Sequence, residues 1–190
     1  MNNLFIAENL KTITKMLPIL KIQMHQKELS FIVKKSHLLP VLFFLKYHIK
    51  YQFKILTCIS GVDYPSQKYR FKVVYELLSV HYNTRLRIKV LINELTPIES
   101  SYKIFPAASW YESEIWDMYG IFFANHQNLT RLLTDYGFEG YPLRKDFPLS
   151  GFVESSYDYS RKRVINERVE LSQEYRAFKF TSPWETLELN

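Results

Sequence analysis

Three carboxylates stand close together in one segment of the chain, at Glu112, Glu114 and Asp117. Carboxylates that face each other can act as general acid and base, but no His, Ser or Cys accompanies these three at a useful spacing. Glu112 follows Ser109 by three residues, which is the spacing of a helix capping box. Glu114 and Asp117 predict a polar helix stripe that faces solvent or a partner. We therefore expect capping and surface roles, with a carboxylate-based hydrolase as the less favoured alternative.

The sequence offers few ligands for a metal or a nucleotide. His126 has no second His or Cys nearby in a ligand pattern, so we expect it to form hydrogen bonds in a loop. Cys58 is the only cysteine, and one thiol can form neither an internal disulfide nor the ligand set of an iron–sulfur cluster. The glycines match neither the G-x-G-x-x-G nor the G-x-x-x-x-G-K-S/T pattern of nucleotide sites. We therefore expect no cofactor in this chain and any redox centre in another one.

Charge is distributed unevenly along the chain. Residues 1–105 contain 16 Lys or Arg and 6 Asp or Glu, a net charge of +10, whereas residues 106–190 contain 9 and 13, a net charge of −4. One interpretation is a basic RNA- or ribosome-associated module, in which Arg87 and Lys89 would meet phosphates. The chain has neither an RNP-type aromatic pattern nor a G-x-x-G loop. Solvated sheet faces and complementarity to a protein partner explain the charge better, and we expect no nucleic-acid partner.

Alternation of apolar and polar residues predicts strands in the first half of the chain. Residues 71–77 and 86–92 form the clearest hairpin, with Asn83 in its turn. Further strands are expected at residues 19–24, 29–33 and 53–59, the last followed by a loop that contains Gly61, Asp63 and Pro65.

Helices are expected to cover this sheet. A short helix is predicted over residues 4–16, and Pro40 suits the first turn of a helix that runs to His48. That second helix is apolar on most sides, so we expect it to be buried on the sheet. Residues 1–105 are therefore predicted to form a two-layer α+β body, with helices on a mostly antiparallel sheet.

The second half of the chain has a different character. A helix is predicted over residues 110–119 and ends at Gly120, and a second short helix is predicted over 127–134. We interpret residues 106–127 as a capped helix with a connecting strand, and residues 128–190 as an extended, irregular C-terminal arm.

No segment of the sequence has the length and apolar character of a membrane span. The longest apolar run, residues 38–45, is far shorter than the roughly 20 residues that a membrane-crossing helix needs. The first twenty residues contain Glu8 and no Arg, unlike an import presequence. If the protein acts in mitochondria, we expect the organelle to make the chain itself.

Residues 134–151, with the sequence TDYGFEGYPLRKDFPLSG, combine many aromatic residues with residues that interrupt regular structure. The glycines and prolines of this run exclude a helix or a central strand. Its rings and its charged triplet Arg144, Lys145 and Asp146 are typical of interface anchors. We therefore expect this segment to pack against another polypeptide.

This run resembles the C-terminal signature of the NADH dehydrogenase subunit 9 family, the 30 kDa-type subunit of respiratory complex I. The resemblance extends over about residues 60–185 and includes GVDYP from Gly61, WYESEIWDMYGIFF from Trp110, HQNLTRLLTDYGF from His126 and SPWE from Ser182. The chain departs from the family pattern at three positions, with Tyr141 in place of His, Ser113 in place of Arg, and Thr130 in place of a basic residue.

The resemblance implies a structural subunit without a cofactor in the matrix arm of NADH:ubiquinone oxidoreductase. Iron–sulfur clusters, FMN and quinone would be bound by partner subunits. The implied partners are the hydrogenase-like large (49 kDa-type) subunit and the iron–sulfur subunits of the quinone module, in a hetero-oligomer on the matrix side of the mitochondrial inner membrane. The residues expected at the partner interface are Trp116, Asp117, Arg131, Asp135, Tyr136, Phe138, Tyr141, Leu143, Arg144, Lys145, Asp146, Phe147 and Trp184.

Overall fold

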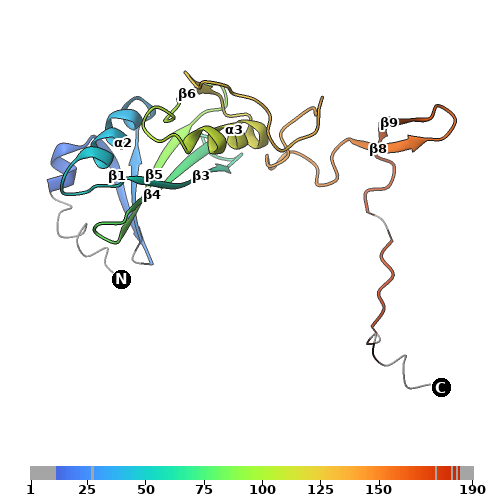
Figure 1. Ribbon diagram of the computed structural model, residues 1–190, viewed down its shortest axis with the longest axis horizontal. Coiled ribbons are helices and arrows are strands. Elements are labelled where there is room, and N and C mark those ends of the chain that lie inside the picture. The colour runs from blue at the N-terminus through green and yellow to red at the C-terminus, as the bar shows by residue number, and fades with distance from the viewer. Residues whose placement is uncertain (1–11, 27, 174, 181, 183, 185–190) are drawn as a thin grey trace. The chain divides into compact units, whose positions relative to one another are not determined.

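The computed structural model describes residues 12–190 with the exception of 27, 174, 181, 183 and 185–190 (Figure 1). The chain divides into two compact units, and the boundary falls between Phe147 and Pro148. The divisions that the sequence predicts after residues 105 and 127 both fall inside the first unit and stay predictions about domain organisation.

A five-stranded sheet forms the centre of the first unit. Its strands lie in the order β1-β2-β5-β4-β3; β2 and β5 are parallel, and the other neighbours are antiparallel. The strands are β1 (Ile19–His25), β2 (Glu28–Val33), β3 (Ile55–Asp63), β4 (Phe71–Ser79) and β5 (Thr84–Ile92). This mixed, mostly antiparallel sheet with few helices confirms the predicted α+β class.

The β4–β5 hairpin shows how the sequence produces this sheet. Tyr75 lies opposite Ile88, and both are fully buried on the inner face. Glu76 lies opposite Arg87 on the outer face, where their side chains form an ion pair. Asn83 has a φ of 48° in the turn, a left-handed conformation that Asn tolerates better than most residues. The predicted half-buried hairpin is thereby confirmed.

Helix α2 packs with one side in the core of the first unit. A 3-10 turn, η1 (Lys35–His37), leads into α2 (Leu38–Tyr47), and Pro40 lies in the first turn as the sequence predicts. Phe43 and Tyr47, on the other side of α2, are 56% and 59% exposed. The prediction that α2 is buried against the sheet holds for the side that carries Leu38, Val41, Leu42 and Leu45, which lie in the same core as the strand residues. The other apolar side of the helix stays exposed.

The helix predicted over residues 4–16 is described only over 12–16, and the rest of it lies outside the described residues. Ile13 of the described turn is fully buried. Among the described residues, no helix is both long enough and apolar enough to cross a membrane.

Helix α3 (Ala108–Tyr119) packs on β3. The hydroxyl of Tyr111 donates to the carbonyl oxygen of Thr57 at 2.9 Å. Gly61 lies under the ring of Tyr119, where a Cβ atom would be 2.7 Å from a ring carbon. Gly61 and Asp63 therefore belong to β3, and the prediction that they lie in the loop after it was wrong. The strand can continue because a residue without a side chain lets α3 approach it closely.

Two short strands connect α3 to the rest of the first unit. Strand β6 (Ile98–Glu99) precedes the helix, strand β7 (Phe123–Ala124) follows it, and the two pair in parallel. The helix ends at Gly120, whose φ of 75° is the left-handed conformation of a helix C-terminus, as the sequence predicts.

The second unit, residues 148–190, contains one β-hairpin. Strands β8 (Val153–Asp158) and β9 (Arg163–Arg168) pair antiparallel around a turn at residues 159–162. None of the described residues of this unit is buried. We call residues 148–190 the hairpin unit.

Candidate functional site

Helix α3 holds its polar residues differently from what the sequence predicts. Ala107 is at the N-cap, and no side chain caps the helix. Glu112 is fully buried, and its carboxylate accepts hydrogen bonds from the hydroxyl of Ser100 and from the N–H and hydroxyl of Ser101, the latter two at 2.8 and 2.7 Å. The predicted capping box of Ser109 and Glu112 was therefore wrong, because this carboxylate binds the serines that precede the helix.

Asp117 of α3 is fully buried and organises the segment that follows the helix. One carboxylate oxygen accepts three consecutive backbone N–H groups, those of Leu132, Leu133 and Thr134, at 3.1, 2.8 and 3.0 Å. The other oxygen accepts the hydroxyl of Thr134 at 2.7 Å and the guanidinium of Arg131 at 3.1 Å. Burial alone would raise the pKa of Asp117, but the donated hydrogen bonds outweigh burial and hold this pKa below its ordinary value.

This arrangement corrects two predictions. Asp117 does not lie on a solvated stripe with Glu114, since its carboxylate is enclosed. Residues 127–134 are not helical. Three N–H groups at the end of that segment donate to Asp117, so they are not available to an α-helical ladder.

Arg131 connects Asp117 to the aromatic residues of the same segment. Its guanidinium donates to the carbonyl oxygen of Gly140 at 3.0 Å. The guanidinium carbon lies 5.8, 5.9 and 5.3 Å from the ring centroids of Trp116, Phe138 and Tyr141. These distances are within the range of cation–π attraction. Arg131 therefore stabilises the loop from the inside and leaves few donors for a partner.

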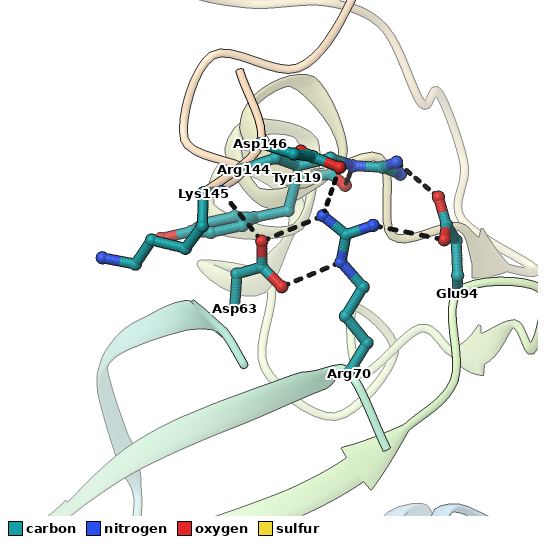
Figure 2. A network of polar contacts seen from close by, with 7 residues as sticks. All are labelled: Asp63, Arg70, Glu94, Tyr119, Arg144, Lys145 and Asp146. Carbon is teal, nitrogen blue, oxygen red and sulfur yellow. Dashed lines mark hydrogen bonds and ion pairs between the residues drawn. The ribbon is translucent and has the colours of Figure 1, made fainter. Parts of the chain in front are cut away.

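A second charged network joins β3 to residues 144–146 (Figure 2). The carboxylate of Asp63 accepts two hydrogen bonds from the guanidinium of Arg70, at 2.9 and 3.1 Å, and one from the backbone N–H of Lys145, at 2.9 Å. Burial would raise the pKa of Asp63, but these donors lower it below its ordinary value. Figure 2 shows the ammonium group of Lys145 pointing away from the network.

Arg144 is the second cation of this network. Its Nε donates to the carbonyl oxygen of Tyr119 at 2.7 Å, and its Nη1 pairs with Glu94. Arg70 also reaches Glu94, at 3.4 Å, and Asp146, at 2.9 Å (Figure 2). Two arginines and three carboxylates therefore hold residues 144–146 against the end of α3 and the start of the β4 hairpin.

Gly120 permits this close packing. A Cβ atom on Gly120 would lie 2.6 Å from the guanidinium of Arg144 and 2.7 Å from the ring of Tyr141. The glycine is thus required both by its positive φ and by the side chains that cover it.

Several apolar side chains of this segment remain exposed although the backbone beneath them is held. The exposed fractions are 60% for Leu133, 51% for Leu143 and 103% for Tyr136. We call residues 128–147 the braced segment. A loop held in place by buried charges that displays apolar groups is the arrangement expected of a preformed docking surface.

The thirteen residues predicted at an interface fall into four groups. Those exposed on the braced segment are Asp135, Tyr136, Leu143, Lys145 and Asp146. Those half-buried in the contacts described above, or near them, are Trp116, Arg131, Phe138, Tyr141, Arg144 and Phe147. Asp117 is buried, and Trp184 of the hairpin unit is 78% exposed.

Sequence reasoning missed Asp63, Arg70 and Glu94 as parts of this site. The partners of these residues lie up to 82 positions away in the chain, as in the hydrogen bond between Lys145 and Asp63. In the sequence, these three residues are recognisable only as charged residues at or near the ends of β3, β4 and β5. Charged residues at strand ends are common on protein surfaces, so they do not indicate a site.

On the outer sheet face, the cations that the RNA-binding interpretation names are bonded to side chains of the same sheet. Arg87 pairs with Glu76 and Glu28, and the ammonium group of Lys89 donates to the side-chain oxygen of Gln23 at 3.1 Å. These contacts use the cations that the RNA-binding interpretation requires. Of the three carboxylates that the hydrolase interpretation uses, Asp117 already accepts hydrogen bonds at both oxygens.

His126 acts as a hydrogen-bonding loop residue, as predicted. Its Nε2 lies 3.2 Å from the carbonyl oxygen of Ser109, and its Nδ1 accepts the N–H of Asn128 at 3.2 Å. These partners place the proton on Nε2. In the part of the chain that the structure describes, there is no group of three or more His, Cys, Asp or Glu that could hold a metal ion.

Known proteins match this chain over most of its length. The family described as "Respiratory-chain NADH dehydrogenase, 30 Kd subunit" matches residues 31–153. NADH-ubiquinone oxidoreductase subunit 9 of Reclinomonas americana is 48% identical over 190 residues, which cover 99% of this chain and 93% of that protein. The protein of the same name from Prototheca wickerhamii is 53% identical over 166 residues, covering 87% and 86%. NADH dehydrogenase (ubiquinone) iron-sulfur protein 3 of Oryza sativa subsp. japonica is 54% identical over 155 residues, covering 82% of each chain. The resemblance seen in the sequence is thereby confirmed, and this chain belongs to the family of 30-kDa subunits of respiratory-chain NADH dehydrogenase, a component of NADH:ubiquinone oxidoreductase.

Proposed function

We propose that this chain is a structural and assembly subunit of the matrix arm of respiratory complex I and supports the quinone-reducing module. The observation that carries this proposal is the braced segment, whose backbone is held by Asp117 and the Asp63 network while Tyr136 and Leu143 stay exposed. A surface that is rigid before it meets its partner loses little conformational entropy on binding. This is the property that an assembly subunit needs.

We propose further that the chain holds no cofactor. The relative from Oryza sativa is called an iron-sulfur protein, but this chain lacks the ligand set of a cluster. Iron–sulfur clusters need several thiolates, and Cys58 is the only cysteine of the chain. Burial also raises the pKa of the Cys58 thiol, which disfavours the thiolate. The residues present do not fit a cluster, so iron–sulfur clusters, FMN and quinone are assigned to partner subunits.

The proposed partners are the hydrogenase-like large (49 kDa-type) subunit and the iron–sulfur subunits of the quinone module. Within the braced segment, the side chains proposed to touch them are the exposed Asp135, Tyr136, Leu143, Lys145 and Asp146. Asp117, Arg131 and Arg144 act on the interface through the loop that they hold. The exposed Trp184 of the hairpin unit is proposed as a further contact.

The contribution of this subunit to turnover is geometric. Electron transfer and quinone reduction need fixed distances between centres that partner subunits hold. A subunit that fixes its neighbours supplies preorganisation without chemistry of its own. We place it on the matrix side of the mitochondrial inner membrane, as a peripheral subunit made by the organelle.

The proposal is tested by the double variant Tyr136→Asp with Leu143→Asp. It adds charge to the exposed surface of the braced segment and leaves the hydrogen bonds to Asp117 and Asp63 in place. We expect loss of matrix-arm assembly on native gels and a parallel loss of NADH:ubiquinone reductase activity. Leu95→Asp is the matched control, since Leu95 is 93% exposed on the loop between β5 and β6 and is not among the predicted interface residues. Normal assembly and activity of the double variant would contradict the proposal, as would normal assembly after truncation of the chain behind Phe123.

A further inference from the structure

The outer side of α2 forms a groove that the site described above does not use. Its walls and floor are Leu39, Pro40, Phe43, Phe44, Tyr47 and His48 of the helix region and Ile104 of the segment before α3. The groove measures about 580 Å³. Because Leu39, Phe43 and Tyr47 follow each other at intervals of four residues, the groove runs along the helix axis.

The groove is ordered and apolar. Phe43 packs on Tyr47 with 4.6 Å between ring centroids. The ring of His48 lies 4.5 Å from the ring of Phe44 and 5.0 Å from that of Tyr51. The Nδ1 of His48 already accepts the backbone N–H of Lys50 at 3.2 Å. Few polar groups are therefore directed into the groove, in contrast to the usual small-molecule site.

The second wall is fixed to the helix by a lysine. Lys46 donates from its ammonium group to the carbonyl oxygen of Ile104 and lies 4.9 Å from the ring centroid of Phe105. This contact fixes Ile104 next to α2, so the groove is formed by the chain itself without an occupant. An exposed apolar surface that is held open in this way is typical of a binding groove.

The charge around the groove specifies its occupant. The stretch that lines the groove, residues 39–48 with Ile104, contains Lys46 and no Asp, Glu or Arg. Lys50 and Lys103 are exposed next to the lining residues His48 and Ile104. An apolar surface flanked by these lysines complements a helix with one apolar face and acidic flanks.

We propose that the α2 groove binds an acidic amphipathic helix of another subunit of the complex. A second copy of this chain is disfavoured because it would bring the lysines of both copies together. The side-chain ridge of a helix that lies parallel to α2 would cover the exposed rings of Phe43 and Tyr47, and a lipid surface is an outcome that the test below distinguishes. This inference rests on the family membership and does not require the braced segment to be an interface.

The proposal is tested in the assembled complex by replacing Phe43 with the photoreactive residue p-benzoylphenylalanine. After irradiation, mass spectrometry identifies the cross-linked peptide. We expect a peptide of another subunit that has helical apolar periodicity and a net negative charge. The same replacement at Met24, which is 59% exposed on β1 and does not line the groove, is the control and should not capture that peptide.

A second measurement tests the role of charge. The variant Lys50→Glu with Lys103→Glu should lower the yield of the Phe43 cross-link by about tenfold, the effect of 1.4 kcal/mol of binding energy, without loss of the subunit from the complex. Cross-links to lipid, to a second copy, to residues 1–11 of the same chain or to a segment without acidic flanks would overturn the proposal. Absence of any cross-link, or a yield that charge reversal leaves unchanged, would overturn it as well.

Discussion

The braced segment and the hairpin unit are both aromatic and mostly exposed, but they differ in how they are held. In the braced segment, Asp117 and Asp63 accept backbone N–H groups from residues far along the chain. The hairpin unit has the ladder of β8 and β9 and a few local contacts, such as the one between Ser150 and Ser172. Its described residues include none that is buried.

The two regions therefore differ in how much ordering remains to occur when a partner binds. An isolated two-stranded hairpin is marginally stable in water, so the hairpin unit needs a partner to bury its side chains. The opposed pair of Glu154 and Glu167 adds like-charge repulsion to that hairpin. The braced segment is preorganised by the folding of its own unit. We therefore expect the first region to recognise a partner and the second to order on it.

The largest effect is expected for Asp117→Ala. The change leaves three backbone N–H groups, the hydroxyl of Thr134 and the guanidinium of Arg131 without their acceptor. Breaking a buried charged network in this way costs about 3–5 kcal/mol of the free energy of unfolding. Urea unfolding of the full chain measures this loss, and amide hydrogen exchange at residues 132–134 should accelerate.

The control for this change is Glu114→Ala on the same helix. Glu114 is half-buried, and we expect its loss to change the free energy of unfolding by no more than about 0.5 kcal/mol, as for ordinary surface substitutions. Equal effects of the two substitutions would remove the distinction between a bracing and a surface carboxylate on which the comparison depends.

A smaller effect is expected for Arg144→Lys. Lysine keeps the charge but cannot reproduce the guanidinium geometry that joins the carbonyl oxygen of Tyr119 to Glu94. The loss of these charge-assisted hydrogen bonds should cost about 1.5–3 kcal/mol in the free energy of unfolding. Lys145→Ala is the neighbouring control, since the network uses only the backbone N–H of Lys145. If both variants were equally destabilised, the side chain of Arg144 would not be the bracing element.

The sequence predicts the regular part of this molecule because local patterns determine it. Alternation at residues 71–77 specifies β4, and Pro40 and Gly120 mark a helix start and a helix end correctly. The braced segment could not be predicted in the same way. Asp117 and Glu114 look alike in the sequence, and what separates them is a loop that returns 15 to 17 residues later to donate to only one of them.

The same limit explains the failed helix prediction at residues 127–134 and the exposed side of α2 that the sequence did not reveal. Composition shows that α2 is apolar on two sides, but not that only one side meets the core. Helical periodicity at 127–134 is present, yet a carboxylate in another element takes up the N–H groups. In both cases a tertiary contact decides between alternatives that the local pattern leaves equal.

Acidification should weaken the braced segment. The pKa values of Asp63 and Asp117 are lowered in the folded protein, chiefly by donated hydrogen bonds that outweigh the effect of burial. Groups with a lowered folded-state pKa stabilise the fold at pH values above the unfolded-state pKa of about 3.9, and this contribution disappears as the pH falls through the folded-state pKa. Urea unfolding between pH 6 and pH 2 should therefore show a decline that begins near pH 4. Asp117→Asn should flatten it, and an unchanged profile would show that Asp117 has no part in the decline.

The smallest effect on the isolated chain is expected for Tyr157→Ser in the hairpin unit. Tyr157 is 51% exposed and lies opposite the exposed Val164, so its loss should change the free energy of unfolding of the full chain by less than about 0.5 kcal/mol. In the assembled complex the same change should reduce retention of the subunit, because the ring is then buried by a partner. Amides of β8 and β9 should exchange rapidly in the free chain and slowly in the complex, whereas those of β4 and β5 should be protected in both. Strong protection of β8 and β9 in the free chain would mean that the hairpin unit supports itself, and the contrast with the braced segment would then be lost.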